Sequence, residues 1–250
     1  MNILITNDDG PEAHGLALLR RAAKAVYPEA KIVTLSPRRG QGGQGLAITP
    51  LAPEELGVEQ IEQDFYVCDG TPADLIYLGL GLPQRYLDRG QFDLVLTGVN
   101  HGHNVGMDVF HSGTVGMAML ATAFFGVTAM AFSQQVEYGP TGLSDETPFR
   151  VAAKYLPFFL EGITHQTDFC RNVNFPSRHP KGQRVCDVSM FSRFRPHLVP
   201  LNKREGEDVA QLEQGFITIS LLRPKTLTGN ADHHGTEQIN GEGNPASSIR

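Results

Sequence analysis

The strongest constraint on the fold is the abrupt change from apolar to acidic residues within residues 2–10. Residues 2–6 form a short apolar run rich in β-branched side chains, and the next four residues, Asn-Asp-Asp-Gly, end it at once. A run bounded in this way is typical of a buried strand that stops at a tight turn. Apolar residues then recur at helical spacing over residues 16–26. The sequence therefore predicts a strand, an acidic turn and a helix.

The acidic turn places Asp8 and Asp9 directly after the first predicted strand. In an open α/β sheet, ligands bind beyond the carboxyl ends of the strands. Two adjacent carboxylates repel each other unless a cation lies between them or one of them is protonated. Oxygen ligands of this kind suit Mg²⁺ or Mn²⁺. The alternative that these residues leave open is an Asx-rich turn that caps the following helix.

Strands and helical patterns alternate along the chain as far as Pro176. Further strands are predicted over residues 31–36, 46–51, 65–68, 92–97, 128–133 and 169–175. Such alternation indicates a doubly wound α/β fold with a mostly parallel sheet, which we assign to a core domain of residues 1–180.

The remaining chain has a different pattern. Residues 185–199 and 216–222 are predicted to be extended, with a charged connection over residues 202–208. These segments have too few local partners to form a sheet alone. We therefore expect residues 181–222 to be a β extension, a hairpin being one arrangement, that packs across a subunit boundary. Residues 223–250 are polar and rich in Gly and Asn, so we expect a disordered tail.

A second polar loop, residues 98–108, follows the predicted strand over residues 92–97. It carries Asn100, whose side-chain carbonyl is a neutral oxygen ligand, and it leads into a helix of small residues predicted over 115–125. The helix N-terminus is formed by Ser112, Gly113 and Thr114. Backbone N–H groups and hydroxyls at such a position bind phosphate.

Other polar segments have simpler interpretations. Residues 37–45 contain four glycines, two Arg and two Gln, which indicates either an anion-contacting loop or a flexible surface excursion. Thr71, Pro72 and Asp74 have the spacing of a helix N-terminus with a capping box, which explains them structurally. His101 and His103 lack the third His or the Cys of a typical zinc site, so we do not expect either to bind metal.

Composition excludes several function classes. The net charge of −6 and pI near 5.8 give no electrostatic footprint for nucleic acid or an anionic membrane. The 3 Cys residues lack paired spacing, which argues against a disulfide framework and for a reducing compartment. Neither a signal peptide nor a membrane-spanning run is recognisable, so we expect a cytoplasmic protein. The missing G-x-G-x-x-G and G-x-x-x-x-G-K-[ST] patterns argue against dinucleotide and P-loop nucleotide binding.

Five motifs together resemble those of the SurE survival-protein family, whose members are metal-dependent 5′-nucleotidases. The motifs are Ile-Thr-Asn-Asp-Asp-Gly at residues 5–10, Asp-Gly-Thr-Pro-Ala-Asp at 69–74, Gly-Val-Asn at 98–100, Ser-Gly-Thr-Val at 112–115 and Asn-Val-Asn-Phe-Pro at 172–176. The resemblance covers most of residues 1–222. It implies a Rossmann-like core, an exchanged β extension, and a homodimer or homotetramer.

The resemblance also implies a set of site residues. One divalent metal ion would be bound by Asp8, Asp9 and Asn100. The phosphate would lie against Ser112 and Thr114, together with Asn104.

This sequence departs from the family at one metal ligand. The family has a Ser in a Gln-Ser-Gly context in the loop after the second strand, and here Gly42 stands at that position. A water molecule, which Mg²⁺ readily retains, could take the vacant place, or Gln41 or Gln44 could reach it. In addition, His111 precedes Ser112 where the family more usually has Tyr.

These observations lead us to expect an enzyme that hydrolyses phosphate monoesters, with nucleoside monophosphates as substrates. The cation would activate a water molecule and polarise the phosphoryl group, the helix N-terminus would neutralise the phosphate oxygens, and Asp8 or Asp9 would accept the proton of the water. The alternative is a non-catalytic nucleotide- or partner-binding protein that has lost a metal ligand at Gly42. A sugar-handling or dehydrogenase-type enzyme is disfavoured because the glycine fingerprint is missing.

Overall fold

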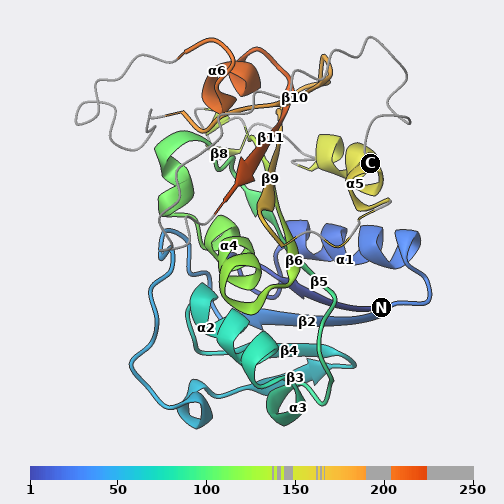
Figure 1. The fold of residues 1–250 in the computed structure, drawn as a ribbon, viewed down its shortest axis with the longest axis vertical. Coiled ribbons are helices and arrows are strands. Elements are labelled where there is room, and N and C mark those ends of the chain that lie inside the picture. The colour runs from blue at the N-terminus through green and yellow to red at the C-terminus, as the bar shows by residue number, and fades with distance from the viewer. Residues whose placement is uncertain are drawn as a thin grey trace.

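The structure, a computed structural model, describes residues 1–136, 149–161, 163, 165, 167–189 and 204–223, with the backbone of residues 138–139 and 142–143. Within these residues, nine strands form one sheet that is covered by helices on both faces (Figure 1). The strands of this sheet are β1 Asn2–Thr6, β2 Lys31–Pro37, β3 Glu59–Glu62, β4 Phe65–Cys68, β5 Leu94–His101, β6 Thr128–Gln134, β9 Cys170–Phe175, β10 Gln183–Val185 and β11 Ile217–Leu222. A separate two-stranded ladder pairs β7 Tyr138–Gly139 with β8 Gly142–Leu143.

The helices lie between these strands. The α-helices are α1 His14–Val26, α2 Pro72–Ile76, α3 Pro83–Tyr86, α4 Gly113–Phe125, α5 Arg150–Leu160 and α6 Asp208–Glu213. Two 3₁₀ segments, η1 Pro53–Leu56 and η3 Gly106–Phe110, and one π-helical segment, η2 Tyr77–Gly81, complete them. Within the part of the chain described above, none of the helices has the length and apolarity needed to span a bilayer.

The strand order is β10-β11-β9-β6-β5-β1-β2-β4-β3. The six strands from β9 to β4 are parallel to one another, whereas β3 and β11 run antiparallel to their neighbours β4 and β9. The chain builds β2 and β4 on one side of β1 and then crosses to build β5, β6 and β9 on the other. This is the doubly wound arrangement that the sequence predicted, and its topological switch point lies between β1 and β5, where ligands bind in such folds.

The first strand shows how the sheet divides the core. Ile3 and Ile5 face one apolar cluster, which contains residues of α1 and α5. Leu4 faces the other cluster, which contains residues of α2 and α4. Figure 1 shows α1 and α5 on one side of the sheet and α2 and α4 on the other. A strand buried on both faces is apolar at every position, which explains the uninterrupted run at the start of the sequence.

The structure corrects three sequence-based expectations. Strand β5 continues to His101 instead of ending at Thr97, because Asn100 pairs with Ser133 and His101 with Gln134 beyond an irregularity in the ladder. Residues 46–51 contain no strand, and Asp208, the last residue of the charged connection expected over residues 202–208, begins helix α6.

The β extension joins the main sheet. Strand β11 pairs antiparallel with β9, and β10 pairs parallel with β11, so β10 and β11 do not form a hairpin. Of the extended segment expected over residues 185–199, only Val185 belongs to a strand among the described residues. Residues 190–199 and the tail expected over residues 223–250, apart from residue 223, lie outside the described residues.

Candidate active site

The acidic turn is locked in place by Asn7. Its Nδ2 donates to the Gly10 carbonyl at 2.7 Å, and its Oδ1 accepts from Ser36 Oγ on β2 at 2.7 Å. Gly10 has a φ of +105°, a conformation that residues with a Cβ rarely adopt. Helix α1 starts only at His14, with Ala13 as N-cap and no capping side chain. The acidic pair therefore does not cap α1, so the helix-capping alternative for these residues is wrong.

Asp8 is buried, with 3% of its surface exposed, and packs against the N-terminus of α4. Its Oδ1 accepts a hydrogen bond from Thr114 Oγ1. A Cβ at Gly113 would lie 2.7 Å from Asp8 Oδ2, so only glycine permits this approach. Thr97 Oγ1 of β5 donates to the Thr114 carbonyl at 2.8 Å and fixes the same helix end. The first acidic residue and the predicted phosphate-binding segment thus meet at the switch point.

Asp9 is exposed to solvent and lies next to the end of β5. Its Oδ2 accepts a hydrogen bond from the His101 backbone N–H at 3.3 Å. The neighbouring Asn100 donates through Nδ2 to the Gly102 carbonyl at 2.8 Å. Because its amide nitrogen is engaged, Asn100 has Oδ1 left as a ligand atom. Two carboxylates and one amide oxygen thus come from the carboxyl-end regions of the neighbouring parallel strands β1 and β5.

The electrostatics of the acidic pair favour a bound cation. Burial, with a smaller contribution from the Asp9 charge, raises the pKa of Asp8 from 3.8 to about 6, against the opposing effect of the hydrogen bond from Thr114. Desolvation by the surrounding protein also raises the pKa of Asp9, although the residue as a whole is exposed. A divalent cation would relieve both effects. The described residues contain no cluster of three or more His, Cys, Asp and Glu side chains. Oxygen donors such as those of Asp8, Asp9 and Asn100 suit Mg²⁺ or Mn²⁺.

The N-terminus of α4 has the properties of an anion site. Ser112 is the N-cap, and its Oγ accepts a hydrogen bond from the Val115 N–H at 3.1 Å. The helix has 13 residues and no acidic residue in its first turn, so its end carries the partial positive charge of the helix dipole. Ser112, Gly113 and Thr114 are all buried at this end.

Asn104 is placed differently from the other phosphate candidates. Its Nδ2 donates to Ser133 Oγ of β6 at 2.9 Å, and its backbone N–H donates to Asn174 Oδ1 at 2.7 Å. Its carbonyl accepts from the side chains of Asn172 and Asn174. These contacts run inward to the sheet and not to the end of α4. Asn172 and Asn174 belong to the Asn-Val-Asn motif but were not among the site residues predicted from the sequence, although two Asn inside an otherwise buried strand are a recognisable signal.

The glycine-rich loop after β2 lies beside the acidic turn. The Gln41 N–H donates to the Asp8 carbonyl at 2.7 Å, which brings the loop to the end of β1. Gly42 is exposed, lacks a positive φ, and a Cβ built on it has nothing within 4 Å. A Ser is therefore compatible with this position. Arg38 is bound by Glu59 and Asp69 at 2.7 and 3.1 Å, so its charge is largely neutralised within the protein.

The predicted capping box of α2 is present and has a second function in the fold. Asp74 Oδ2 accepts from the Thr71 N–H at 2.8 Å, and Thr71 Oγ1 donates to the Ala47 carbonyl at 2.6 Å. Asp74 also accepts from the backbone and the hydroxyl of Thr49. The capping residues therefore hold the segment at Ala47 and Thr49, which directly follows the glycine-rich loop.

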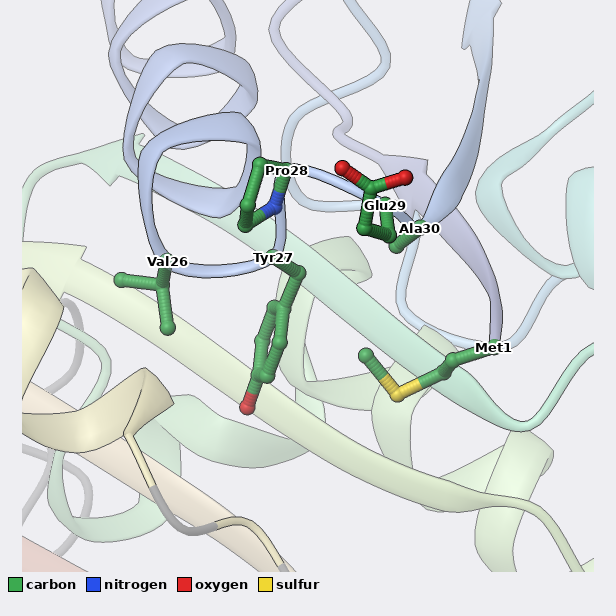
Figure 2. Close-up of a pocket in the computed structure, with 6 residues that line it drawn as sticks. All are labelled: Met1, Val26, Tyr27, Pro28, Glu29 and Ala30. Carbon is green, nitrogen blue, oxygen red and sulfur yellow. The ribbon is translucent and has the colours of Figure 1, made fainter.

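The three cysteines are not part of this site, and neither is a pocket at the amino ends of the strands. All three cysteines are free and buried, and burial raises the pKa of Cys68 to about 11 and those of Cys170 and Cys186 to about 12, so none is an activated thiol. Figure 2 shows a pocket at the amino ends of β1 and β2, whereas the acidic turn follows the carboxyl end of β1. Its lining is mostly apolar and consists of Met1, Val26, Tyr27, Pro28, Glu29 and Ala30.

Fold and site together define the class of this protein. It is a doubly wound α/β protein in which an acidic pair meets the N-terminus of a helix at the topological switch point. A family model described as "Survival protein SurE" matches residues 3–194. The chain therefore belongs to the SurE family, which confirms the resemblance indicated by the five sequence motifs.

Individual relatives agree with this assignment. The 5′-nucleotidase SurE of Clostridium beijerinckii is 30% identical over 244 residues, and the match covers 89% of this chain and 92% of that protein. The 5′-nucleotidase SurE of Brucella abortus (strain S19) is 37% identical over 191 residues, covering 74% and 71% of the two chains. The crystal structure of the SurE protein from Aquifex aeolicus matches with a TM-score of 0.70 at 28% identity and covers 89% of this chain and 93% of that one.

Proposed function

We propose that this protein is a metal-dependent 5′-nucleotidase that hydrolyses the phosphate ester of nucleoside monophosphates. The names of its relatives in Clostridium and Brucella support the activity. The structural observation that carries the proposal is the contact of Asp8 with Thr114. This contact joins a pair of carboxylates to a helix N-terminus, the two features that a phosphate ester and a cation require side by side.

The metal ligands in this proposal are Asp8, Asp9 and the Oδ1 of Asn100. A bound Mg²⁺ or Mn²⁺ supplies a Lewis acid that lowers the pKa of a water molecule and polarises the phosphoryl group. Asp8 is held for this task by Thr114, and Asp9 is held by the His101 N–H. Asp9 is also the better candidate to accept the proton of the attacking water, because it is exposed whereas Asp8 is buried.

The phosphate-binding role belongs to Ser112, Gly113 and Thr114. Backbone N–H groups and the hydroxyl of Ser112 at the end of α4 would donate to the phosphate oxygens and stabilise charge that develops in the transition state. We assign Asn104 to the anchoring of its own loop instead, because its hydrogen bonds run to β6 and β9.

The alternative is a nucleotide-binding protein without catalysis, lapsed through loss of the Ser ligand at Gly42. Both charged ligands are retained, and they supply most of the attraction for a dication. A water molecule can fill the place of one neutral ligand. We therefore favour an active enzyme that requires a higher metal concentration than relatives with the Ser.

Assembly and location complete the proposal. We expect a homodimer or homotetramer in the cytoplasm. Among the described residues, β10 is the last strand on its side of the sheet, with Val185 57% exposed, and an edge strand of this kind can pair with a second chain. The three free cysteines fit a reducing compartment.

A phosphate-release assay tests the proposal. The purified protein is incubated with AMP, GMP, CMP, UMP and a 3′-nucleotide in Mg²⁺, Mn²⁺ or EDTA. We expect release from 5′-nucleotides with either metal and none with EDTA. Absence of release from every nucleotide at millimolar metal would favour the binding protein.

A further inference from the structure

The side chains of two asparagines of β9 form hydrogen bonds to the loop between β5 and η3. Asn172 and Asn174 are both fully buried, and their strand β9 lies between β11 and β6 in the sheet. Asn174 lies beside Ser133 of β6 in the sheet register, and all three side chains bind Asn104. We propose that Asn172 and Asn174 are positioning residues for the metal ligand Asn100, an inference that rests on the proposed function.

Asn172 and Asn174 together form a clamp that binds the backbone of Asn104. Asn174 Oδ1 accepts from the Asn104 N–H at 2.7 Å, and Asn174 Nδ2 donates to the Asn104 carbonyl at 3.1 Å. Asn172 Nδ2 donates to the same carbonyl at 2.8 Å. One peptide position is thus bound on both its donor and its acceptor side, which fixes its place and its orientation relative to the sheet.

The clamp reaches Asn100 through Gly102. The Gly102 N–H donates to the Gln134 carbonyl at 3.0 Å, and the Gly102 carbonyl accepts from Asn100 Nδ2 at 2.8 Å. Gly102 and Asn104 are two residues apart, so a shift at Asn104 moves the carbonyl that orients the Asn100 side chain. His101 lies between Asn100 and Gly102, and its backbone N–H donates to Asp9. The loop therefore connects β9 to two of the three metal ligands.

The chemistry of the clamp requires amides. An apolar side chain at position 174 would leave the buried N–H of Asn104 without its acceptor, which is costly in a protein interior. Thr218 and Ser220 of β11 lie directly opposite Asn174 and Asn172 in the ladder and are equally buried. Their hydroxyls have no hydrogen-bond partner among the described residues. Burial on this face of the sheet therefore does not by itself create a contact with the loop.

Asn174 and Thr218, which lie opposite each other in the ladder, supply a matched pair of variants. Asn174→Ala removes both bonds to Asn104, whereas Thr218→Val removes a buried hydroxyl at the opposite position without touching the loop. Mn²⁺ binding to the metal-stripped full chain is measured by calorimetry without substrate, and KM, kcat and Tm are measured in parallel. We expect Asn174→Ala to weaken Mn²⁺ binding by about tenfold, the lower range for residues that orient a ligand. Thr218→Val is expected to bind Mn²⁺ as the wild type does.

Opposite outcomes are readily recognised. A role in folding alone would lower Tm and the active fraction while Mn²⁺ affinity and KM stayed at wild-type values, and this result would overturn the proposal. Equal loss of Mn²⁺ affinity in Thr218→Val would overturn it as well. If Asn174→Ala does not fold, Asn172→Ala takes its place, because it removes one of the two donors to the Asn104 carbonyl. We expect Asn172→Ala to lose Mn²⁺ affinity to a smaller extent. Unchanged Mn²⁺ affinity in this variant would contradict the clamp.

Two further results separate this inference from others. Asn104→Ala keeps the backbone bonds to β9, so it should lose less Mn²⁺ affinity than Asn174→Ala; the reverse order would mean that the Asn104 side chain itself serves the site. A wild-type protein that binds Mn²⁺ but releases no phosphate from nucleotides would refute the proposed function, while the binding comparison would still decide the positioning role.

Discussion

Replacing Asp8 with Asn should stabilise the metal-free protein while it removes the activity. Asp8 is almost fully buried, and its pKa is raised from 3.8 to about 6, mainly by burial. Each pKa unit corresponds to about 1.4 kcal/mol, so the charged form of Asp8 destabilises the fold by about 3 kcal/mol. Asn has the same shape without the charge, and its Oδ1 still accepts from Thr114 Oγ1.

The sign of this effect depends on pH. A carboxyl group whose pKa is higher in the folded protein favours folding when it is protonated, so stability is lost as the pH rises from about 4 to about 6. At pH 8 the full penalty of about 3 kcal/mol applies to the wild type, and at pH 4 only about 0.5 kcal/mol remains. For a chain of this size, the difference at pH 8 corresponds to an increase in Tm of about 6–12 °C.

The assay is thermal and urea denaturation of both proteins in EDTA at pH 8 and pH 4, with phosphate release measured in Mn²⁺. We expect Asp8→Asn to be inactive and more stable at pH 8, with most of the advantage gone at pH 4. Asp9→Asn serves as a control, because Asp9 is exposed and should give a smaller gain in stability with a similar loss of activity. The reasoning is refuted if Asp8→Asn is no more stable than the wild type at pH 8, or if its advantage is the same at both pH values.

Three other predictions address the metal and the assembly. Gly42→Ser should lower the Mn²⁺ concentration needed for half-maximal activity by about fivefold, which corresponds to about 1 kcal/mol for one neutral ligand. A Cβ at position 42 has open space around it and Gly42 lacks a positive φ. An unchanged Mn²⁺ requirement would therefore contradict the prediction and could not be attributed to strain. Mn²⁺ affinity should fall as the pH drops below about 6, because the proton on Asp8 must leave before the metal binds. Calorimetry in buffers of different ionisation enthalpy should detect the release of this proton. Equal affinity at pH 5 and pH 7 would contradict the role of Asp8. Sedimentation at micromolar concentration should show a dimer or a larger oligomer, and a monomer would count against exchange of the β extension.

The sequence alone determined the features that depend on near neighbours. The apolar run before the acidic turn predicted β1, and the Thr71–Asp74 spacing predicted the capped start of α2, since both depend on residues within a few positions. The alternation of strand and helix patterns likewise predicted the doubly wound sheet. The candidate residues Asp8, Asp9 and Asn100 could be found in the same way, because oxygen-bearing side chains at strand ends gather at one edge of such a sheet.

Only the tertiary structure decided what those residues do to one another. The burial of Asp8 and its contact with Thr114 join segments 106 residues apart, and no local pattern reports the desolvation that raises the pKa of Asp8. The extension of β5 to His101 depends on its partner β6, and the inward orientation of Asn104 depends on β9. Whether the acidic turn caps α1 was likewise decided only by the structure, in which Ala13 is the N-cap and no side chain caps the helix. Periodicity and turn chemistry act over a few residues and can be read from the chain, whereas burial, strand pairing and side-chain hydrogen bonds arise only when distant segments pack together.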